Sequence, residues 1–215
     1  HPLFRDALKR TVASLFPMAM LLEADSTASL QQQLEAAEDP DLLLLDLHMP
    51  GSSGFSGLVH VRARYPSLPV IVVSGNEEPS VMRRAMAHGA SGYIPKSSSL
   101  AEMAQAIASV LDGNVWLPNS AAGAQPVHLA PDEVDIAHRI RDLTPQQFRV
   151  LMMLADGLLN KQIAYELNVS EATIKAHMTA ILKKLGASNR TQAVVAAARL
   201  QLDPSMRIVD VAEED

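Results

Sequence analysis

The sequence predicts a parallel α/β domain followed by a smaller all-α domain that contains a helix-turn-helix. Three observations lead to this prediction. Short apolar segments alternate with amphipathic segments over residues 1–112, which is typical of repeated strand–helix units. Residues 113–142 are rich in Pro, Ala and Gly and predict a linker with at most one short helix. Trp116 in this linker is expected to pack on the first domain. Residues 143–200 have helical periodicity, and a chain of 215 residues is long enough for two domains.

The first domain is expected to alternate helices and strands along the chain. Helices are predicted at Pro2–Leu15, Thr27–Ala37, Phe55–Tyr65, Ser80–His88 and Leu100–Asp112. Strands are predicted at Ala19–Glu23, Leu42–Asp46, Val70–Ser74 and Gly92–Ile94. Because the strands are separated by helices, we expect them to run parallel, with helices on both faces of the sheet.

The net charge of −6 is unevenly distributed. Residues 1–138 have 8 Lys and Arg against 15 Asp and Glu, which gives −7. Residues 139–200 have 9 against 4, which gives +5, and the acidic tail 201–215 has 1 against 5, which gives −4. A basic segment in an acidic chain suggests a polyanionic partner, although a solvated surface produces this pattern about as often.

The composition also excludes several kinds of chemistry. Cys is absent, which excludes disulfides, thiolate catalysis and cysteine-ligated zinc and fits a reducing cytoplasm. The 7 His residues do not cluster at metal-ligand spacing. Since no apolar run approaches the roughly 20 residues of a membrane span, we expect a cytoplasmic protein that does not enter a membrane.

Polar residues end three of the predicted strands. The segment DLLLLD ends at Asp46, VIVVS ends at Ser74, and GYIPK ends at Lys96. The carboxyl ends of parallel strands meet at one edge of a sheet, so these side chains should converge. Such a set suits reversible phosphorylation, with Asp46 as the nucleophile, Lys96 as a fixed cation for the phosphoryl oxygens and Ser74 as a hydrogen-bond partner. On its own segment alone, Asp46 is equally well interpreted as a cap of the following turn.

The segments LLLLDLHMPG, VVSG and GASGYIPKS, in this order and spacing, resemble the receiver domain of two-component response regulators over residues 1–112. This resemblance implies a flavodoxin-like fold in which a cognate sensor histidine kinase phosphorylates Asp46. It also implies that Ser74 and Tyr93 form a switch pair and that Lys96 senses the phosphoryl group. The backbone carbonyl of His48 would bind Mg²⁺ together with Asp46.

The first residues, HPLFRDAL, resemble the segment that directly follows the first strand of this family and its acidic pair. We therefore expect the receiver domain to be N-terminally incomplete. In the strand order 2-1-3-4-5, the absent strand would lie between the strands at 19–23 and 42–46. Mg²⁺ is expected only if the upstream acidic pair is present, because Asp46 alone supplies too few carboxylates.

The second domain is predicted to be a helix-turn-helix. Thr144 and Pro145 suit an N-cap and a first helical residue, and Gly157 ends that helix. Further helices are expected at Lys161–Leu167, Glu171–Leu185 and Asn189–Leu200. Two short helices separated by a tight break at Asn168 are typical of this motif.

The helix Glu171–Leu185 has one face that suits the major groove of DNA. Small and basic residues that are predicted on this face are Lys175, Ala176, Thr179 and Lys183. Residues predicted to hold phosphates are Asn160, Lys161, Ser170 and Thr173. The alternative is an ordinary helical bundle with a solvated charged face.

The segments KQIA, TIKAH, KKLG and NRTQA resemble the C-terminal domain of the NarL/FixJ (LuxR-type) regulators over residues 143–200. The resemblance implies that Lys175, Ala176 and Thr179 occupy the recognition-helix positions and that the last helix mediates dimerisation. Val194 and Ala197 belong to a stripe of small apolar residues on that helix, so a homodimer on double-stranded DNA is expected.

These segments together predict a DNA-binding transcription regulator, not an enzyme, that is switched by phosphorylation of Asp46. The alternative is a phosphorylation-independent regulator that is controlled by its expression or by a protein partner at the receiver. A hydrolase or phosphatase fused to a helical domain lacks support, because the sequence has neither a nucleophile elbow nor a histidine base.

Overall fold

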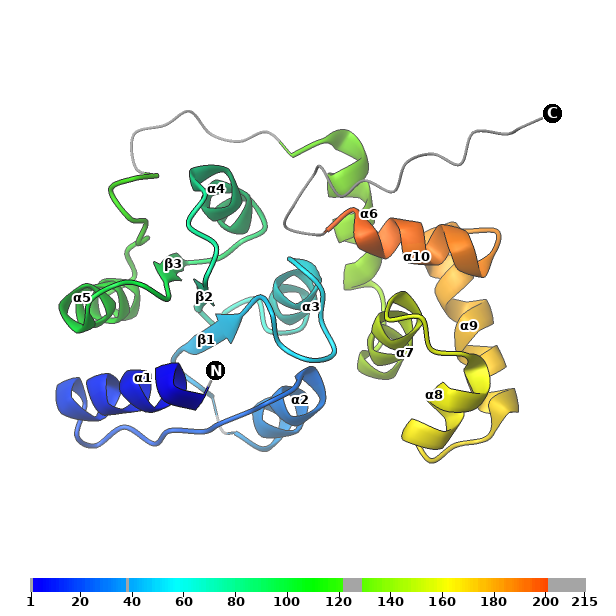
Figure 1. The fold of residues 1–215 in the computed structure, drawn as a ribbon, viewed down its shortest axis with the longest axis horizontal. Helices are drawn as coiled ribbons and strands as arrows, with labels where there is room; N and C mark the ends of the chain where they lie inside the picture. Colours follow the sequence, from blue (N-terminus) through cyan, green and yellow to red (C-terminus); the bar gives the residue numbers. More distant parts are fainter. Residues whose placement is uncertain (1, 38, 122–128, 201–215) are drawn as a thin grey trace. The chain divides into compact units, whose positions relative to one another are not determined.

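The computed structural model describes residues 2–37, 39–121 and 129–200, and the chain divides into two compact units, His1–Leu129 and Ala130–Asp215 (Figure 1). The boundary between the units falls within the predicted linker. In the described ranges, no helix is both long enough and apolar enough to cross a membrane.

The first unit contains a parallel sheet with the strand order β1-β2-β3. Its strands are β1 (Leu43–Asp46), β2 (Val70–Ser74) and β3 (Gly92–Pro95). In the register of the sheet, Leu44 lies opposite Ile71, and Val72 lies opposite Tyr93. All residues of the central strand β2 are buried, as its continuous apolar sequence predicts for a strand covered on both faces.

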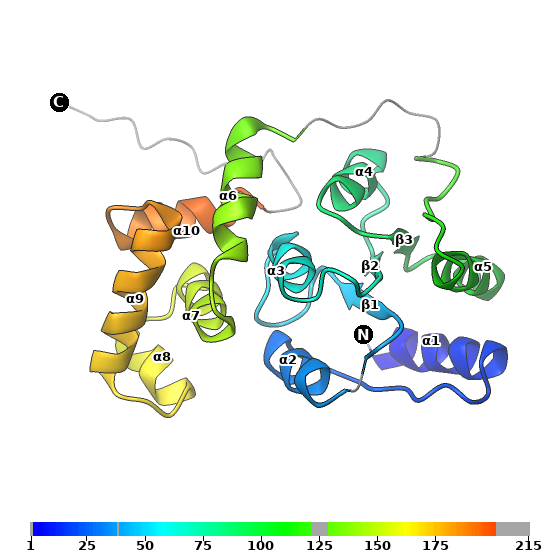
Figure 2. The same ribbon diagram turned by 180° about the vertical axis from the view of Figure 1, so that it is seen from behind.

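Helices cover both faces of this sheet (Figures 1 and 2). They are α1 (Pro2–Leu15), α2 (Thr27–Ala36), α3 (Ser56–Arg64), α4 (Pro79–Ala87) and α5 (Leu100–Leu111). α1 and α5 lie side by side and share one apolar cluster with the sheet, in which Ile107 of α5 and Ile71 of β2 are buried and Leu8 of α1 packs against them.

The backbone of Trp116 pairs with β3 along the edge that faces away from β2. The Tyr93 N–H donates to the Trp116 carbonyl (3.1 Å), and the Trp116 N–H donates to the Ser91 carbonyl (3.1 Å). Its side chain packs against the cluster under α5. The interpretation of Trp116 as a packing residue is therefore confirmed.

The prediction of a strand at Ala19–Glu23 is wrong. This segment has no strand pairing, and Met20 within it and Met18 just before it are 84% and 96% exposed. The segment is tied to α1 through Glu23, whose carboxylate binds Lys9 Nζ (2.9 Å) and Arg5 Nε (3.2 Å). A strand forms only where a neighbour takes its backbone hydrogen bonds, and no described segment does so here.

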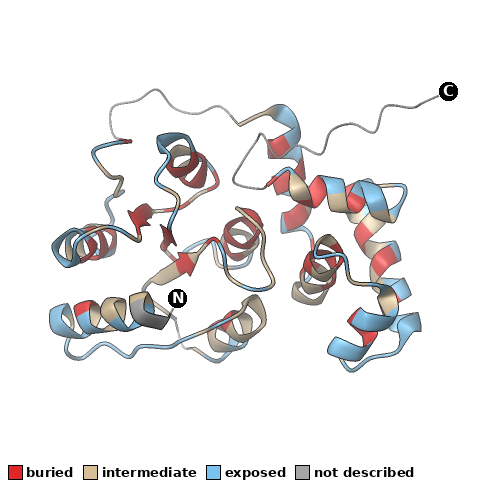
Figure 3. Cartoon of the chain, in the orientation of Figure 1, coloured by how far each residue is buried: buried red, intermediate tan, exposed pale blue. Residues whose placement is uncertain are grey.

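The second unit is helical throughout its described part. Its helices are α6 (Pro131–Arg141), α7 (Pro145–Ala155), α8 (Asn160–Glu166), α9 (Glu171–Leu185) and α10 (Arg190–Ala198). Thr144 caps α7 in a capping box with Gln147, and Gly186 ends α9 in the left-handed region with a φ of 66°. The buried stripes of these helices face one another (Figure 3). α6 lies within the predicted linker segment but packs as part of this unit.

Candidate phosphorylation site and nucleic-acid interface

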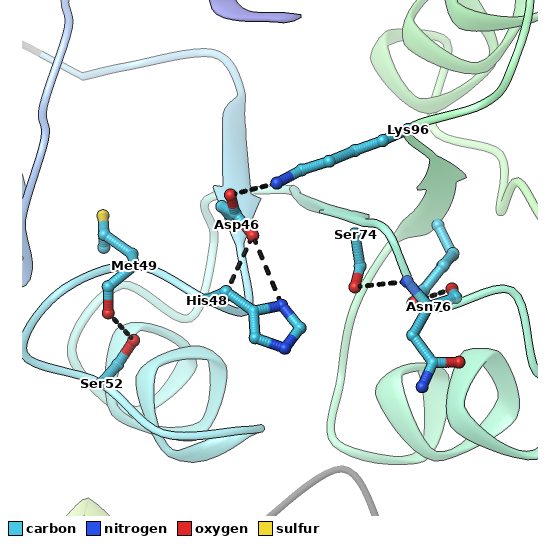
Figure 4. Close-up of polar contacts among 8 residues, drawn as sticks. Asp46, His48, Met49, Ser52, Ser74, Asn76 and Lys96 are labelled. Atoms are coloured by element: carbon cyan, nitrogen blue, oxygen red, sulfur yellow. Dashed lines mark hydrogen bonds and ion pairs between the residues drawn. The ribbon is translucent and has the colours of Figure 1, made fainter. Parts of the chain in front are cut away.

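Asp46 and Lys96 form an ion pair at the carboxyl edge of the sheet (Figure 4). Asp46 is the last residue of β1, and Lys96 directly follows β3. The Lys96 ammonium donates to Asp46 Oδ2 at 2.5 Å, and the two side chains are 19% and 29% exposed. The structure thus brings together two predicted site residues that are 50 positions apart, and it leaves the carboxylate accessible from solvent.

The second oxygen of Asp46 orients the loop that follows β1. Asp46 Oδ1 accepts a hydrogen bond from the His48 N–H at 3.0 Å. In this contact Asp46 caps the turn, which is the role that the sequence also allowed. Asp46 therefore both caps the turn and forms the ion pair with Lys96. The His48 imidazole lies with its Nδ1 4.0 Å from the same oxygen and is largely exposed (Figure 4).

Ser74 and Tyr93 meet at one residue that the sequence analysis did not identify, Asn76. The Ser74 hydroxyl oxygen accepts a hydrogen bond from the Asn76 N–H (3.2 Å), and the Tyr93 hydroxyl donates to the Asn76 carbonyl (2.7 Å). Both side chains are fully buried. Asn76 contributes its backbone to these two contacts, and its side-chain Oδ1 accepts the Glu78 N–H (2.8 Å). The available signals were its place just after the end of β2 and an Asn side chain that suits a turn.

Burial raises the pKa of the Tyr93 hydroxyl, and the hydrogen bond from Ser74 opposes this rise. The nearby Asp46 carboxylate raises the pKa further, since a negative charge disfavours a phenolate. Tyr93 is therefore a neutral hydrogen-bond donor at physiological pH, and its hydroxyl fixes the loop after β2 to the sheet.

The described residues do not make up a complete magnesium site. No group of three or more His, Asp or Glu side chains among them is placed to hold a metal ion. The loop offers the Asp46 carboxylate and the His48 carbonyl, and one oxygen of Asp46 is already paired with Lys96. Because Mg²⁺ prefers near-ideal octahedral oxygen coordination, these donors alone do not fit it.

In the second unit, α8 and α9 form the predicted helix-turn-helix. Ile174, Met178, Ile181 and Leu185 of α9 are buried, and they recur at helical spacing. The exposed residues of α9 include Lys175, Ala176, Thr179 and Lys183. The predicted DNA-reading residues therefore share one accessible helix face, and the two charged residues among them, Lys175 and Lys183, are cations.

The residues predicted to hold phosphates differ in their availability. Lys161 is exposed near the start of α8. Ser170 caps α9 by accepting the Thr173 N–H (3.1 Å), and the two hydroxyl oxygens are 2.8 Å apart. Asn160 is half-buried, with its Oδ1 3.5 Å from Arg190 Nη1. Ser170, Thr173 and Asn160 therefore also stabilise the ends of helices.

The two residues of α10 that were predicted for dimerisation, Val194 and Ala197, differ in their accessibility. Ala197 is only 2% exposed, because it packs into the core of its own unit, so it is not available to a second chain. Val194 is half-buried, and Val195 is 36% exposed. The stripe of small residues thus serves mainly the unit itself, and the outward apolar side chain of α10 is Val195.

The two units match two separate family models. Residues 1–108 match the response regulator receiver domain, and residues 141–197 match the bacterial regulatory proteins of the luxR family. A receiver domain joined to a helix-turn-helix domain defines a transcription regulator of the response-regulator class, which confirms the predicted fold class. The chain belongs to the NarL/FixJ family of two-component response regulators, whose DNA-binding domain is of the LuxR type.

Several known proteins are similar over almost their whole length. The glycerol metabolism activator of Pseudomonas putida is 38% identical over 214 residues, which cover 96% of each chain. The nitrate/nitrite response regulator NarL of Escherichia coli K12 is 30% identical, over 91% of this chain and 90% of that protein. RcsB from Salmonella enterica serovar Typhimurium, solved bound to promoter P1flhDC, superposes with a TM-score of 0.54 at 22% identity, over 94% of this chain and 95% of that one. The likeness to RcsB concerns the fold alone.

Proposed function

We propose that this protein is a transcription regulator whose DNA binding is switched by phosphorylation of Asp46 by a sensor histidine kinase. The observation that carries the proposal is the contact of Lys96 Nζ with Asp46 Oδ2 at the carboxyl edge of the sheet. A carboxylate held by a lysine at this edge, and 29% exposed, is suited to accept a phosphoryl group.

In the proposed reaction, an Asp46 oxygen attacks the phosphorus of the donor and the bond to the donor's leaving group breaks. Lys96 then neutralises part of the charge on the transferred phosphoryl oxygens. The Ser74 hydroxyl hydrogen-bonds one of these oxygens after it releases the Asn76 N–H. Since Tyr93 is bound to the same Asn76 backbone, the loop after β2 moves with both side chains and carries the signal away from Asp46.

DNA binding is assigned to the exposed face of α9, with Lys175 and Thr179 at bases and Lys161 at phosphate. The test is binding of the full-length protein to a duplex that it selects from a random-sequence library. We expect the affinity to fall roughly tenfold to hundredfold between about 50 and about 200 mM salt, because about three lysine–phosphate contacts release counterions. Failure to select any duplex would refute this assignment.

We further propose that two copies bind a two-fold symmetric site through the outward face of α10. The substitution Val195→Glu should lower cooperative binding to a site with two half-sites by about tenfold or more, because it places an unpaired charge in an apolar contact. Binding to a single half-site should change little. Titration of both DNAs in a mobility-shift assay measures the difference.

The matched control is Val115→Glu, which puts the same charge on a 68% exposed valine of the first unit. This variant should keep cooperative binding. Equal losses on one and two half-sites for Val195→Glu, with the helix content unchanged by circular dichroism, would place the contact elsewhere. Ala197→Glu is unsuited to this test, since a charge at a 2% exposed core position should unfold the unit.

A phosphorylation-independent regulator is the second candidate, and one observation favours it. The described residues near Asp46 do not complete a magnesium site, whereas receiver domains generally bind Mg²⁺ for phosphorylation. In this case a protein partner at the first unit or the amount of protein would set DNA occupancy. DNA binding that is the same with and without a phosphoryl donor would support it.

A further inference from the structure

α6 and α9 hydrogen-bond each other's C-terminal ends. Arg139 of α6 donates from Nη1 to the carbonyl of Leu185, the last residue of α9, at 2.7 Å. In return, Lys184 of α9 donates from Nζ to the carbonyl of Asp142, the C-cap residue of α6, at 2.8 Å. The last carbonyls of a helix have no partner within the helix, and a cation there also interacts favourably with the helix dipole. Each helix thus supplies the cation that the other needs.

Both cations are held in place by further contacts. Arg139 Nε binds Asp135 Oδ2 at 2.8 Å one turn earlier on α6, which fixes the plane of the guanidinium. Lys184 Nζ also donates to Gln147 Oε1 at 2.7 Å, and the same oxygen accepts the Thr144 N–H in the capping box of α7. The end of α9 is therefore tied to α6 and to the start of α7 at once.

α6 also contacts α10. Asp132, in the first turn of α6, pairs with Arg199 at the end of α10, with 3.3 Å between Oδ2 and Nη1. This pair is half-exposed and contributes little by itself. The apolar face of α6 is buried, with Ile140 fully inaccessible and Ile136 6% exposed. α6 therefore has side-chain contacts with the proposed DNA-reading helix and with the proposed dimerisation helix.

We infer that α6 positions the reading face of α9, and that Arg139 is the positioning residue for the contacts of α9 with bases. This inference rests on the proposed DNA-binding function. Arg139 holds the C-terminal end of α9, whereas Lys175 lies ten residues earlier, about 15 Å away along the helix axis. If α9 tilted by about 4° about its C-terminal end, Lys175 would move by about 1 Å. A displacement of this size is enough to weaken a directed hydrogen bond to a base.

A positioning role of Arg139 predicts an effect on DNA binding that a purely stabilising role does not. Contacts with bases depend on direction, whereas contacts of flexible lysines with phosphates tolerate small displacements. Loss of the Arg139 contact should therefore weaken binding to a selected sequence more than binding to random DNA. The specificity ratio should change, while the salt dependence set by the phosphate contacts should not.

The experiment compares Arg139→Ala with Arg141→Ala in the full-length protein. Arg141 is exposed on the same helix, so its removal is a matched loss of charge. Each protein is titrated with the duplex that the wild type selects from a random-sequence library and with a scrambled duplex of equal length. We expect Arg139→Ala to lower the ratio of specific to non-specific affinity by about threefold to tenfold, and Arg141→Ala to leave the ratio unchanged.

If Arg139→Ala lowers both affinities equally, or if both variants change the ratio alike, the inference is overturned. If Arg139→Ala does not fold by circular dichroism, Arg139→Lys replaces it, because lysine keeps the charge and the stem but lacks the two-sided fork that serves Asp135 and Leu185 together. A wild-type ratio in Arg139→Lys would then overturn the inference. Failure of the wild type itself to select any duplex would instead refute the proposed DNA-binding function.

Discussion

Asp46→Asn is expected to abolish phosphorylation of the protein. The amide of Asn has nearly the same shape as the carboxylate, so it should preserve the loop after β1, but it cannot form an acyl phosphate. It also removes the charge that Lys96 pairs with at 2.5 Å. After incubation with acetyl phosphate in a magnesium-containing buffer, intact mass measurement should show one added phosphoryl group on the full-length wild type and none on the variant.

The matched control is Asp41→Asn, the same exchange at an exposed residue before β1. This variant should take up one phosphoryl group, as the wild type does. Uptake by Asp46→Asn at the wild-type level would mean that another residue is the acceptor. If the wild type takes up no phosphoryl group but still binds its selected duplex, regulation without phosphorylation becomes the better hypothesis.

The contact of Asp46 with Lys96 was predictable from the sequence for a topological reason. Both residues end apolar segments, and in a sheet of parallel strands such ends lie at one edge whatever the lengths of the helices between them. The same argument placed Ser74 at this edge. It did not place the Asn76 backbone, because a loop conformation depends on which groups it must satisfy, and these are Ser74 and Tyr93.

The predicted strand at Ala19–Glu23 is wrong because it required a partner that the pattern does not specify. The apolar segment at Ala19–Glu23 has strand composition, yet a strand needs a hydrogen-bonding neighbour, and the segment is joined to α1 only through the ion pairs that are described for Glu23. Ala197 belongs to a stripe that suits either a core or an interface, and only tertiary packing decides between them. The one short helix that the linker segment allowed is α6, and its packing in the second unit, with Ile136 and Ile140 buried, depends on tertiary contacts that composition does not specify.

Lys175→Ala is expected to lower the affinity for the selected duplex by about fivefold to 150-fold. Lys175 is exposed beside the buried stripe of Ile174 and Met178, in the N-terminal half of α9, which is the half expected to meet base edges. A bidentate contact of lysine with guanine is worth about 1–3 kcal/mol of discrimination, which corresponds to this range. Titration of the selected and scrambled duplexes by fluorescence anisotropy measures both affinities.

Two comparisons separate a contact with a base from a general effect of charge. Lys183→Ala removes a lysine from the same face two turns later, where we expect a contact with phosphate. The affinities for the selected and the scrambled duplex should then fall by similar factors, and the slope of the salt dependence should decrease by about 1. Arg10→Ala removes an exposed cation from α1 in the first unit and should change neither affinity. If Lys175→Ala behaves as Lys183→Ala does, Lys175 meets only phosphate, and sequence recognition must come from other residues of α9, with Ala176 and Thr179 the nearest on the same face.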